Sequence, residues 1–221
     1  MRSDLLAPLQ RQVLDVLART PHSFFLSGGA ALGPFYLHHR TSADLDLFAA
    51  SEQDFGEAPR LADVLVRETG LRATPERTGP SFRRIILESM SDALRLDFVF
   101  DVPPQIVTPK PVVNGVRIDS LEDIVCNKIG AILDRGEVRD LIDLFFLDRA
   151  GYRTQEWWRH TLRKEAGLTP EILAHQVSTV PVDAPWPRLV VPLDLPQLRA
   201  YRDDLALDLA RQAFPRSPTA P

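Results

Sequence analysis

The fold is decided by the stretch that begins Ser27-Gly28-Gly29 and ends Ser42-Ala43-Asp44-Leu45-Asp46-Leu47-Phe48. Two glycines at a strand-to-helix turn let backbone N–H groups approach phosphate oxygens without a Cβ in the way. The helix that follows adds the positive end of its dipole. In a strand, Asp44 and Asp46 point to one face while Leu45 and Leu47 point to the other. We therefore expect a phosphate-binding turn beside a strand with one acidic face and one core face.

Paired carboxylates are ligands that suit Mg²⁺, with Mn²⁺ as the alternative, together with water and substrate phosphate. Two metals about 4 Å apart would activate an attacking hydroxyl and stabilise a leaving pyrophosphate. Asp97 lies within Leu94-Arg-Leu-Asp97-Phe-Val-Phe100, among apolar residues where an unpaired acid would be costly. We interpret Asp97 as a third metal ligand and a candidate base. Each feature alone is common in ordinary turns and strands, and their combination in this order predicts a catalytic metal site.

The surrounding pattern predicts a mixed-sheet α/β (α+β) core followed by a helical half. We expect helices over residues 4–19 and 61–67, a helix from Ala30, and strands at residues 23–26, 44–48, 82–88 and 94–100. Asn114-Gly115 between Val112-Val113 and Val116-Ile118 predicts a hairpin. Helical patterns then begin at Ser120, near Leu141, and at residues 156–165, Thr169 and Pro196. Residues 181–196 are proline-rich and we expect them to be extended, and a Pro/Ser tail follows Phe214. We place the core at residues 1–115 and the helical domain at 116–221.

The composition is that of an ordinary globular protein, with 44% hydrophobic and 25% charged residues and a net charge of −4. No apolar run approaches the roughly 20 residues of a membrane span, and we expect a cytoplasmic protein. The single cysteine, Cys126, lies in an apolar helical pattern and is interpreted as a core residue. Because the net charge is negative, any RNA contact must depend on local positive charge, and no DNA partner is expected.

Two separated blocks resemble the AbiEii/AbiGii toxin family, which includes the MenT-type toxins, within the DNA polymerase β-like nucleotidyltransferase superfamily. The first block is Gly28-Gly29-Ala-Ala-Leu32 with His39-Arg40-Thr-Ser42-Ala-Asp44-Leu-Asp46-Leu47. The second is Ser120-Leu-Glu-Asp123 with Lys128, Arg135, Arg139-Asp140 and Asp143. The resemblance covers about residues 24–148.

The resemblance implies a toxin-type enzyme that transfers a nucleoside monophosphate from a nucleoside triphosphate (NTP) to an acceptor, for MenT-type members the 3′ end of tRNA. It also implies a cognate antitoxin. Carried over, Asp44 and Asp46 would bind metal and Lys128 would face phosphate. Asp140 or Asp143 would orient Lys128 or Arg135, without a choice between the two aspartates. The residues expected at the nucleotide are Ser27, Gly28, Gly29, Arg40, Ser42, Lys128, Arg135, Asp140 and Asp143.

The residues of the second block agree with this without requiring it. Lys128 and Arg135 lie two helical turns apart on one face, so both could meet a polyanion. Ordinary ion pairs on two solvated helices would give the same pattern. Basic residues that are candidate RNA contacts, or else solvated surface, are Arg83-Arg84 and Arg153, Arg159, Arg163 and Lys164 beside Trp157-Trp158.

Other functions stay open from the sequence. The acceptor could be a protein or a small hydroxylated molecule, which the acidic composition favours. The chain could also be a non-catalytic nucleotide-binding partner, which the intact Asp44, Asp46 and Asp97 argue against. Phosphate transfer of the kinase type shares the triphosphate and Mg²⁺, but the glycine turn and paired aspartates favour attack on the α-phosphate.

Overall fold

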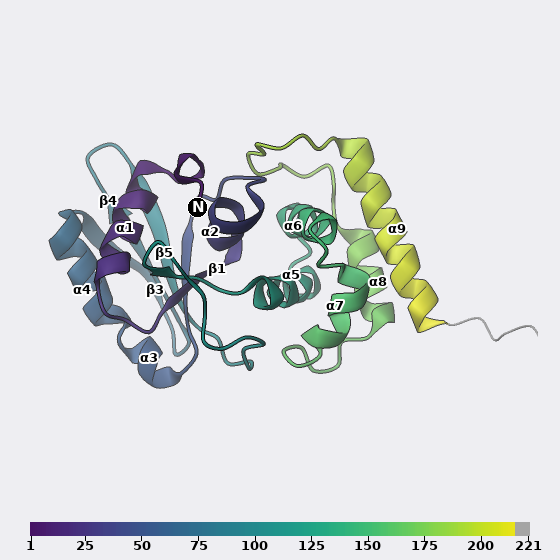
Figure 1. The fold of residues 1–221 in the computed structure, drawn as a ribbon, viewed down its shortest axis with the longest axis horizontal. Helices are drawn as coiled ribbons and strands as arrows, with labels where there is room; N and C mark the ends of the chain where they lie inside the picture. The colour runs from purple at the N-terminus through teal and green to yellow at the C-terminus, as the bar shows by residue number, and fades with distance from the viewer. Residues whose placement is uncertain (215–221) are drawn as a thin grey trace, which may run out of the picture. The chain divides into compact units, whose positions relative to one another are not determined.

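A computed structural model describes residues 1–214, so the expected tail after Phe214 lies outside the described part. The chain divides into two compact units, Met1–Ile124 and Val125–Pro221. The first contains the strands, the last of which ends at Arg117, and the second is helical. The predicted mixed-sheet α/β class with a helical second half is confirmed (Figure 1).

The first unit is built on a five-stranded sheet of order β1-β2-β5-β4-β3. Its strands are β1 (Phe25–Ser27), β2 (Leu45–Ala49), β3 (Arg72–Thr78), β4 (Phe82–Glu88) and β5 (Ala93–Phe100). β2 and β5 are parallel and the other neighbouring pairs are antiparallel. The sequence pattern did not predict β3, because it is an edge strand with mostly exposed residues and a proline, so it shows no alternation of apolar side chains.

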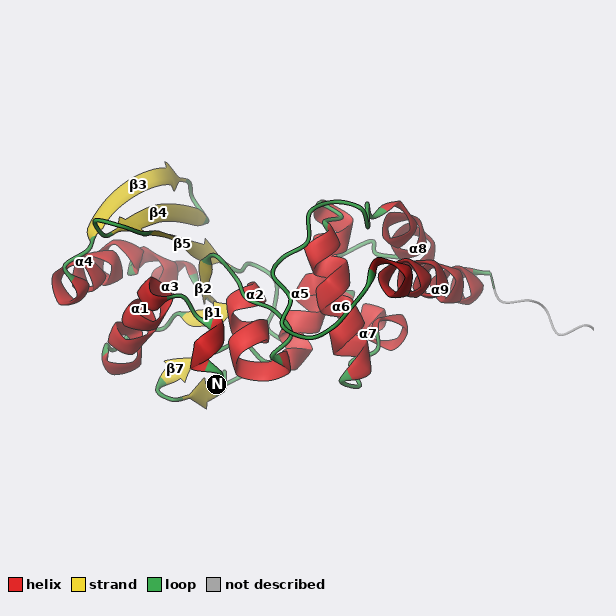
Figure 2. Ribbon diagram, turned by 90° about the horizontal axis from the view of Figure 1, so that it is seen from above, coloured by secondary structure: helices red, strands yellow, loops and turns green. Residues whose placement is uncertain are grey.

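Three helices cover one face of this sheet: α1 (Pro8–Arg19), α3 (Glu52–Gly56) and α4 (Ala58–Thr69) (Figure 2). Leu47, Leu96 and Phe98 are almost fully buried on that face. A short helical turn, η1 (Ser3–Leu5), precedes α1, whose first residue is the proline that suits a helix start. α4 ends at Gly70 in the left-handed conformation, as predicted from the glycine.

The glycine turn is followed by helix at once. α2 (Gly28–Ala31) starts two residues before the expected Ala30 and continues as a π-helical segment, η2 (Leu32–Leu37). The predicted hairpin is confirmed as β6 (Val112–Val113) and β7 (Val116–Arg117). Asn114 and Gly115 both have positive φ, as a two-residue hairpin turn requires.

The second unit consists of helices. α5 (Leu121–Asp134) begins before the division and is followed by α6 (Val138–Arg149), α7 (Thr154–Thr161), α8 (Pro170–Thr179) and α9 (Leu195–Ala213). The Thr169 hydroxyl accepts a hydrogen bond from Ile172 N, which confirms the predicted cap of α8. Cys126 is fully buried, as predicted. Across residues 1–214, every helix is too short or too polar to span a lipid bilayer.

Candidate active site

Position 28 needs a glycine for two reasons, the conformation of its backbone and the closeness of the Asp46 side chain. It follows β1 with a φ of +64°, in the left-handed region that side chains disfavour. A Cβ built on it would lie 2.7 Å from Oδ2 of Asp46. The turn therefore places the Asp46 carboxylate directly against the backbone that opens α2.

Gly29 makes room for an arginine. A Cβ at Gly29 would lie 2.5 Å from Nη2 and 2.9 Å from Nη1 of Arg40, and one at Gly33 would meet the Arg40 carbonyl oxygen. Arg40 is only 3% exposed, and its Nη1 donates to the Thr41 carbonyl at 2.9 Å. Protein groups thus occupy the positions where these Cβ atoms would lie, and the approach of phosphate to the backbone N–H groups stays a prediction. The turn brings a buried guanidinium and a carboxylate together.

Asp44 lies one residue before β2, at the end of a loop that α1 anchors. The fully buried Gln10 donates from Nε2 to the carbonyl oxygens of Ser42 (2.9 Å) and Asp44 (3.4 Å). The Asp44 carboxylate is 25% exposed and lies 3.2 Å from Nη1 of Arg95 on β5. Gln10 was absent from the residues expected at the site. A buried glutamine in an otherwise apolar helical pattern was the signal for it.

The strand register aligns the acids in one row across the sheet. Ser27 of β1 is the partner of Asp46 on β2, Asp46 of Asp97 on β5, and Asp97 of Arg84 on β4. Partners in register point to the same face, so these side chains share the face opposite the covering helices. The row was not visible in the sequence, because the strand order 1-2-5-4-3 creates it.

Asp97 pairs with an arginine, and this ion pair explains how its carboxylate is stabilised in an apolar strand. It is 5% exposed, and its two carboxylate oxygens accept from Nε (2.7 Å) and Nη2 (2.6 Å) of Arg84. The hydrogen bonds to Asp97 raise the pKa of Arg84 above its ordinary value. The cost of burying Asp97 is therefore offset by Arg84, so its location in an apolar strand does not by itself argue for a metal, and its role as a ligand or base stays a prediction.

We tested whether these residues fit a divalent cation. In the described part of the chain, no group of three or more His, Cys, Asp or Glu side chains is arranged to hold a metal. Mg²⁺ usually takes only one or two carboxylates, and water and substrate phosphate complete its shell. Asp46 on β2 and Asp44 just before it supply such a pair, because Asp44 contacts Arg95, which lies two residues before Asp97 on β5. Asp97 would first have to leave Arg84. The donor set fits one cation held by Asp44 and Asp46.

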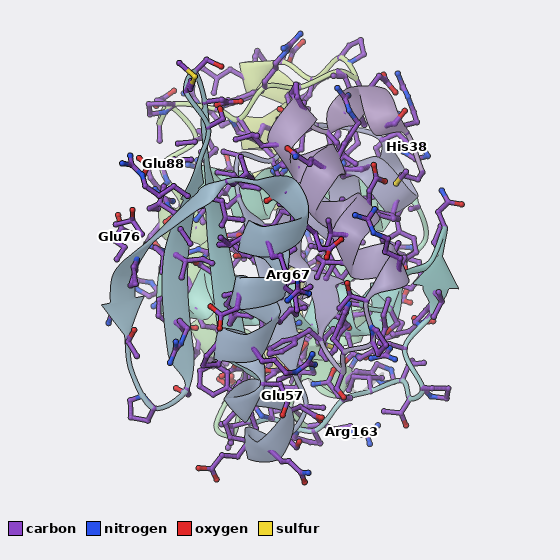
Figure 3. All side chains as sticks on the ribbon, turned by 90° about the vertical axis from the view of Figure 1, so that its left-hand side faces the viewer. His38, Glu57, Arg67, Glu76, Glu88 and Arg163 are labelled. Atoms are coloured by element: carbon purple, nitrogen blue, oxygen red, sulfur yellow. The ribbon has the colours of Figure 1, made fainter. Side chains whose placement is uncertain are left out.

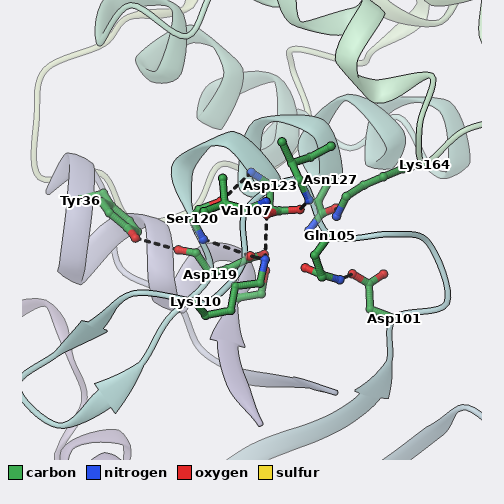
Figure 4. A network of polar contacts seen from close by, with 12 residues as sticks. Tyr36, Asp101, Gln105, Val107, Lys110, Asp119, Ser120, Asp123, Asn127 and Lys164 are labelled. Carbon is green, nitrogen blue, oxygen red and sulfur yellow. Dashed lines mark hydrogen bonds and ion pairs between the residues drawn. The ribbon is translucent and has the colours of Figure 1, made fainter. Parts of the chain in front are cut away.

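Ser27 belongs to a buried polar network that the sequence did not reveal. Figure 4 shows three other members of this network, Lys110, Asp119 and Asp123. Its Oγ donates to Oδ2 of Asp119 at 2.7 Å, and Nζ of Lys110 lies 2.7 Å from both Asp119 and Asp123. Burial is the largest effect on Asp119 and raises its pKa, although Lys110 and Ser27 oppose it. Lys110 is one of only three lysines in a chain rich in arginine, and that rarity was the available signal.

Asp123 does more than cap a helix. Its backbone N–H donates a capping hydrogen bond to Ser120 Oγ (3.1 Å). Its carboxylate accepts from the backbone N–H groups of Ile106 (2.8 Å) and Val107 (3.0 Å). The network therefore ties the segment after β5 to the residue that precedes the glycine turn.

In the second unit, Lys128 lies between two aspartates. Its Nζ is 2.9 Å from Oδ1 of Asp140 and 2.7 Å from Oδ2 of Asp143, and all three side chains are almost completely buried. Arg135 donates to both oxygens of Asp140 from Nε (2.8 Å) and Nη2 (2.9 Å). Both cations of the expected polyanion face thus meet the same carboxylate. Two positive and two negative charges balance, so the cluster is neutral overall.

Asp140 is strongly engaged by these cations. Burial, the largest effect, would raise its pKa, but Lys128 and Arg135 together lower it below its ordinary value. Asp140 pairs with both cations, and Asp143 is paired by Lys128. The geometry brings together the four residues named from the second block.

Of the two adjacent tryptophans, Trp158 is buried, whereas Trp157 is half-buried against the rings of Tyr152 and His160. Trp158 is 8% exposed, and its Nε1 donates to Oε1 of Gln212 in α9 at 2.9 Å. Lys164 donates to Oδ1 of Asn127. Trp158 therefore packs within the helical unit.

The two adjacent arginines of β4 face opposite ways. Arg84 lies in the acid row, whereas Arg83 is the register partner of Phe98, a core residue of the helix-covered face. Only Arg84 therefore shares the face of the candidate site.

Comparison with known proteins places this geometry in a family. Residues 13–214 match the family model described as nucleotidyl transferase AbiEii toxin, type IV toxin–antitoxin system. The uncharacterized protein aq_aa25 of Aquifex aeolicus (strain VF5) is 30% identical over 145 residues, which cover 63% of this chain and 66% of that protein. The match thus spans just under two thirds of this relative's length.

Two solved structures from Helicobacter pylori share the fold. A proposed nucleotidyltransferase superposes with a TM-score of 0.62 at 21% identity and covers 92% of each chain. JHP933 superposes with a TM-score of 0.58 at 19% identity, over 92% of this chain and 90% of that one. At these identities the likeness shows the fold alone.

Proposed function

The chain belongs to the AbiEii family of nucleotidyltransferase toxins of type IV toxin–antitoxin systems, and we propose that it transfers a nucleoside monophosphate from an NTP to the 3′ end of an RNA, with tRNA as the acceptor. The observation that carries this proposal is the contact between the glycine turn and the acidic strand. Gly28 has no Cβ where Asp46 Oδ2 lies, and Asp44, one residue before β2, contacts Arg95 on β5. The glycine turn that we propose binds phosphate is thus adjacent to the carboxylates that we propose bind metal.

Asp44 and Asp46 would hold the divalent cation, Mg²⁺ or Mn²⁺, and when bound it supplies positive charge that offsets the charge of the triphosphate. Gln10 fixes the loop that carries Asp44, so the two carboxylates are held before substrate arrives. Ser42 and the buried Arg40 lie at the same turn and would bind triphosphate oxygens.

In the proposed reaction, the acceptor hydroxyl oxygen forms a bond to the α-phosphorus, and the bond from that phosphorus to the pyrophosphate oxygen breaks. The hydroxyl proton leaves to a base in solvent. Asp97 is disfavoured as that base, because both of its oxygens accept hydrogen bonds from Arg84. The atoms balance as NTP plus acceptor giving nucleotidylated acceptor plus pyrophosphate.

The neutral Lys128 cluster lies in the second unit, and we propose that it serves the nucleotide phosphates. A phosphate group would compete with Asp140 and Asp143 for the cations, so this role requires at least one ion pair to rearrange. As a type IV toxin family member, the chain has an antitoxin as its expected partner.

The test is incubation of purified protein with a divalent cation, each α-labelled NTP in turn and total bacterial RNA. Label should enter a tRNA-sized band with the wild type and not with Asp44→Ala. Asp63→Ala, which changes an aspartate on α4 away from the acid row, should behave as the wild type. Label found on protein or on a small molecule instead of RNA would disprove the RNA acceptor, and γ-label in the product would disprove nucleotidyl transfer.

A further inference from the structure

The acid row changes sign as it continues across the sheet. After Asp46 and Asp97 comes Arg84 on β4, and the register partner of Arg84 is Arg77 on the edge strand β3. Neighbouring strands lie about 4.8 Å apart, so the row steps from carboxylates to guanidiniums within two strands. One end of the row therefore adjoins the glycine turn, and the other end is cationic.

Arg84 is fixed in place but retains donors. Nε and Nη2 bind Asp97, and Nη1 lies 3.6 Å from Oε2 of Glu76, which is beyond hydrogen-bond distance. A guanidinium has five N–H donors, so three remain for another acceptor. The side chain is 27% exposed, whereas Asp97 is 7% exposed. The buried carboxylate orients the fork, and the free edge of the fork reaches solvent.

Arg77 supplies a second cation on the same surface. Its guanidinium lies 5.5 Å from the centre of the Phe82 ring, and that of Arg84 lies 5.3 Å from it. Both distances are within the range of cation–π contacts. The two guanidiniums and one aromatic ring therefore form a single patch, the Arg77–Phe82–Arg84 patch.

The strands around this patch differ in charge from the rest of the chain. Residues 72–95 contain five arginines and three acids, although the whole chain has a net charge of −4. Two of the acids, Glu76 and Glu88, lie at the β3–β4 edge (Figure 3). Glu88 pairs with Arg72 at 3.0 Å, whereas Arg84 is paired by Asp97 at 2.6 Å and lies 3.6 Å from Glu76. The two cations of the patch are therefore Arg77 and the acid-paired Arg84.

The geometry of phosphoryl transfer suggests what the Arg77–Phe82–Arg84 patch binds. Attacking and leaving oxygens lie roughly in line on opposite sides of the phosphorus. If the triphosphate lies over the glycine turn beside β1, the acceptor approaches across Asp97 from the β4 side. We propose that Arg77 and Arg84 bind the phosphodiester backbone of the acceptor RNA near its 3′ end, with Asp97 as the residue that positions Arg84. This inference rests on the proposed function and deepens it.

Single-stranded RNA is the occupant that this chemistry suits. Guanidiniums bind phosphate through paired N–H donors, and an aromatic ring between them offers a surface for a base. A protein acceptor carries no regular series of phosphates, so it would gain little from two adjacent cations.

The test uses Arg84→Gln and Arg77→Gln with Arg83→Gln as the matched control, because Arg83 is on the same strand but faces the opposite side of the sheet. The binding probe is a short 5′-labelled single-stranded RNA with a free 3′ hydroxyl, measured by fluorescence anisotropy without NTP. Each of the first two variants should weaken binding about tenfold and reduce the salt slope by about one. The control should bind as the wild type does.

Pyrophosphate binding with Mg²⁺, measured by calorimetry, separates the two sides of the site. It should be unchanged in all three variants. A loss of pyrophosphate affinity in Arg84→Gln with unchanged RNA affinity would place Arg84 at the nucleotide and overturn the inference. Asp97→Asn should weaken RNA binding in the same direction, and its salt slope should fall because Arg84 is no longer oriented.

Arg77→Gln keeps the test decisive if Arg84→Gln does not fold. Arg77 is exposed, and its guanidinium lies over the Phe82 ring. RNA binding and acceptor KM equal to wild type in Arg77→Gln would overturn the inference while leaving RNA labelling by the wild type intact. Absence of labelling by the wild type would instead contradict the proposed function, and the binding comparison would still report on the patch.

Discussion

Gly28→Ala should separate the effect of backbone strain from the effect of a displaced carboxylate. The φ of +64° at Gly28 costs an alanine about 1 kcal/mol. For a chain of this length that lowers Tm by about 2–4 °C. In addition, the new Cβ would lie 2.7 Å from Oδ2 of Asp46, which is closer than a real Cβ contact. Because this oxygen is the end of a side chain, Asp46 would turn aside.

Gly70→Ala is the matched control. Gly70 has a φ of +71°, and a Cβ there would have open space within 4 Å. Both variants should therefore lose a similar amount of stability in thermal unfolding. Gly28→Ala should also lose about 100-fold in the rate of nucleotide transfer, because a displacement of about 1 Å at a reacting centre has an effect of that size. Gly70→Ala should retain the wild-type rate.

Two outcomes would refute the reasoning. A wild-type transfer rate in both variants would show that the position of Asp46 beside Gly28 does not matter for the reaction. Loss of activity in Gly70→Ala to the level of Gly28→Ala would show that strain alone, away from the site, is sufficient. Thermal unfolding of each variant ensures that the rates are compared on folded protein.

Three further predictions concern buried polar groups. Lys128→Met should lower the free energy of unfolding by about 3–5 kcal/mol, because it leaves Asp140 and Asp143 buried without their shared cation. In the control Arg211→Met, which removes an exposed ion pair, denaturant unfolding should show a loss of less than about 1 kcal/mol. Equal losses in the two variants would contradict the prediction. The pKa of Asp140 is lowered in the folded protein, so its ionisation adds stability that is present above the unfolded pKa of about 3.9 and is lost as the pH falls through the lower folded value. The Tm values of wild type and Asp140→Asn should therefore converge as the pH falls below about 4. A Tm difference that stays constant with pH would contradict this. Gln10→Met should lower the rate of nucleotide transfer more than a stability-matched Gly70→Ala does, because it releases the Ser42–Asp44 backbone. A wild-type rate in folded Gln10→Met would exclude this anchoring role.

Local sequence patterns predicted most elements of the sheet, because strong alternation marks half-buried strands. The bounds expected for β4 agree with those observed, and β5 begins one residue earlier than expected. β3 could not be predicted in this way, since Arg72–Thr78 gains its strand pairing from β4 and has little apolar content of its own. The helix after the glycine turn starts earlier than expected because Gly28, and not Ala30, is its first residue.

The partners of the site residues depended on register and could not be read from spacing. Arg84 meets Asp97 because β4 and β5 pair antiparallel, and the two residues are 13 apart in sequence. Asp119 and Asp123 share Lys110 because the segment after β5 folds back on the start of α5. The residues of the family motifs, by contrast, were identifiable from the sequence, since their types and order persist whatever their partners are.

The cost of separating each carboxylate from its partner indicates where a cation can enter. The Asp97–Arg84 pair is bidentate and its carboxylate is almost fully buried, so removing the partner from Asp97 would leave a buried charge at a cost of about 3–5 kcal/mol. The Asp44–Arg95 pair has side chains that are 25% and 45% exposed, and such pairs contribute about 1 kcal/mol or less. A divalent cation would therefore displace Arg95 from Asp44 far more readily than Arg84 from Asp97. On this argument the proposed cation would bind on the β2 side of the row, and Asp97 would keep Arg84 oriented toward the proposed acceptor.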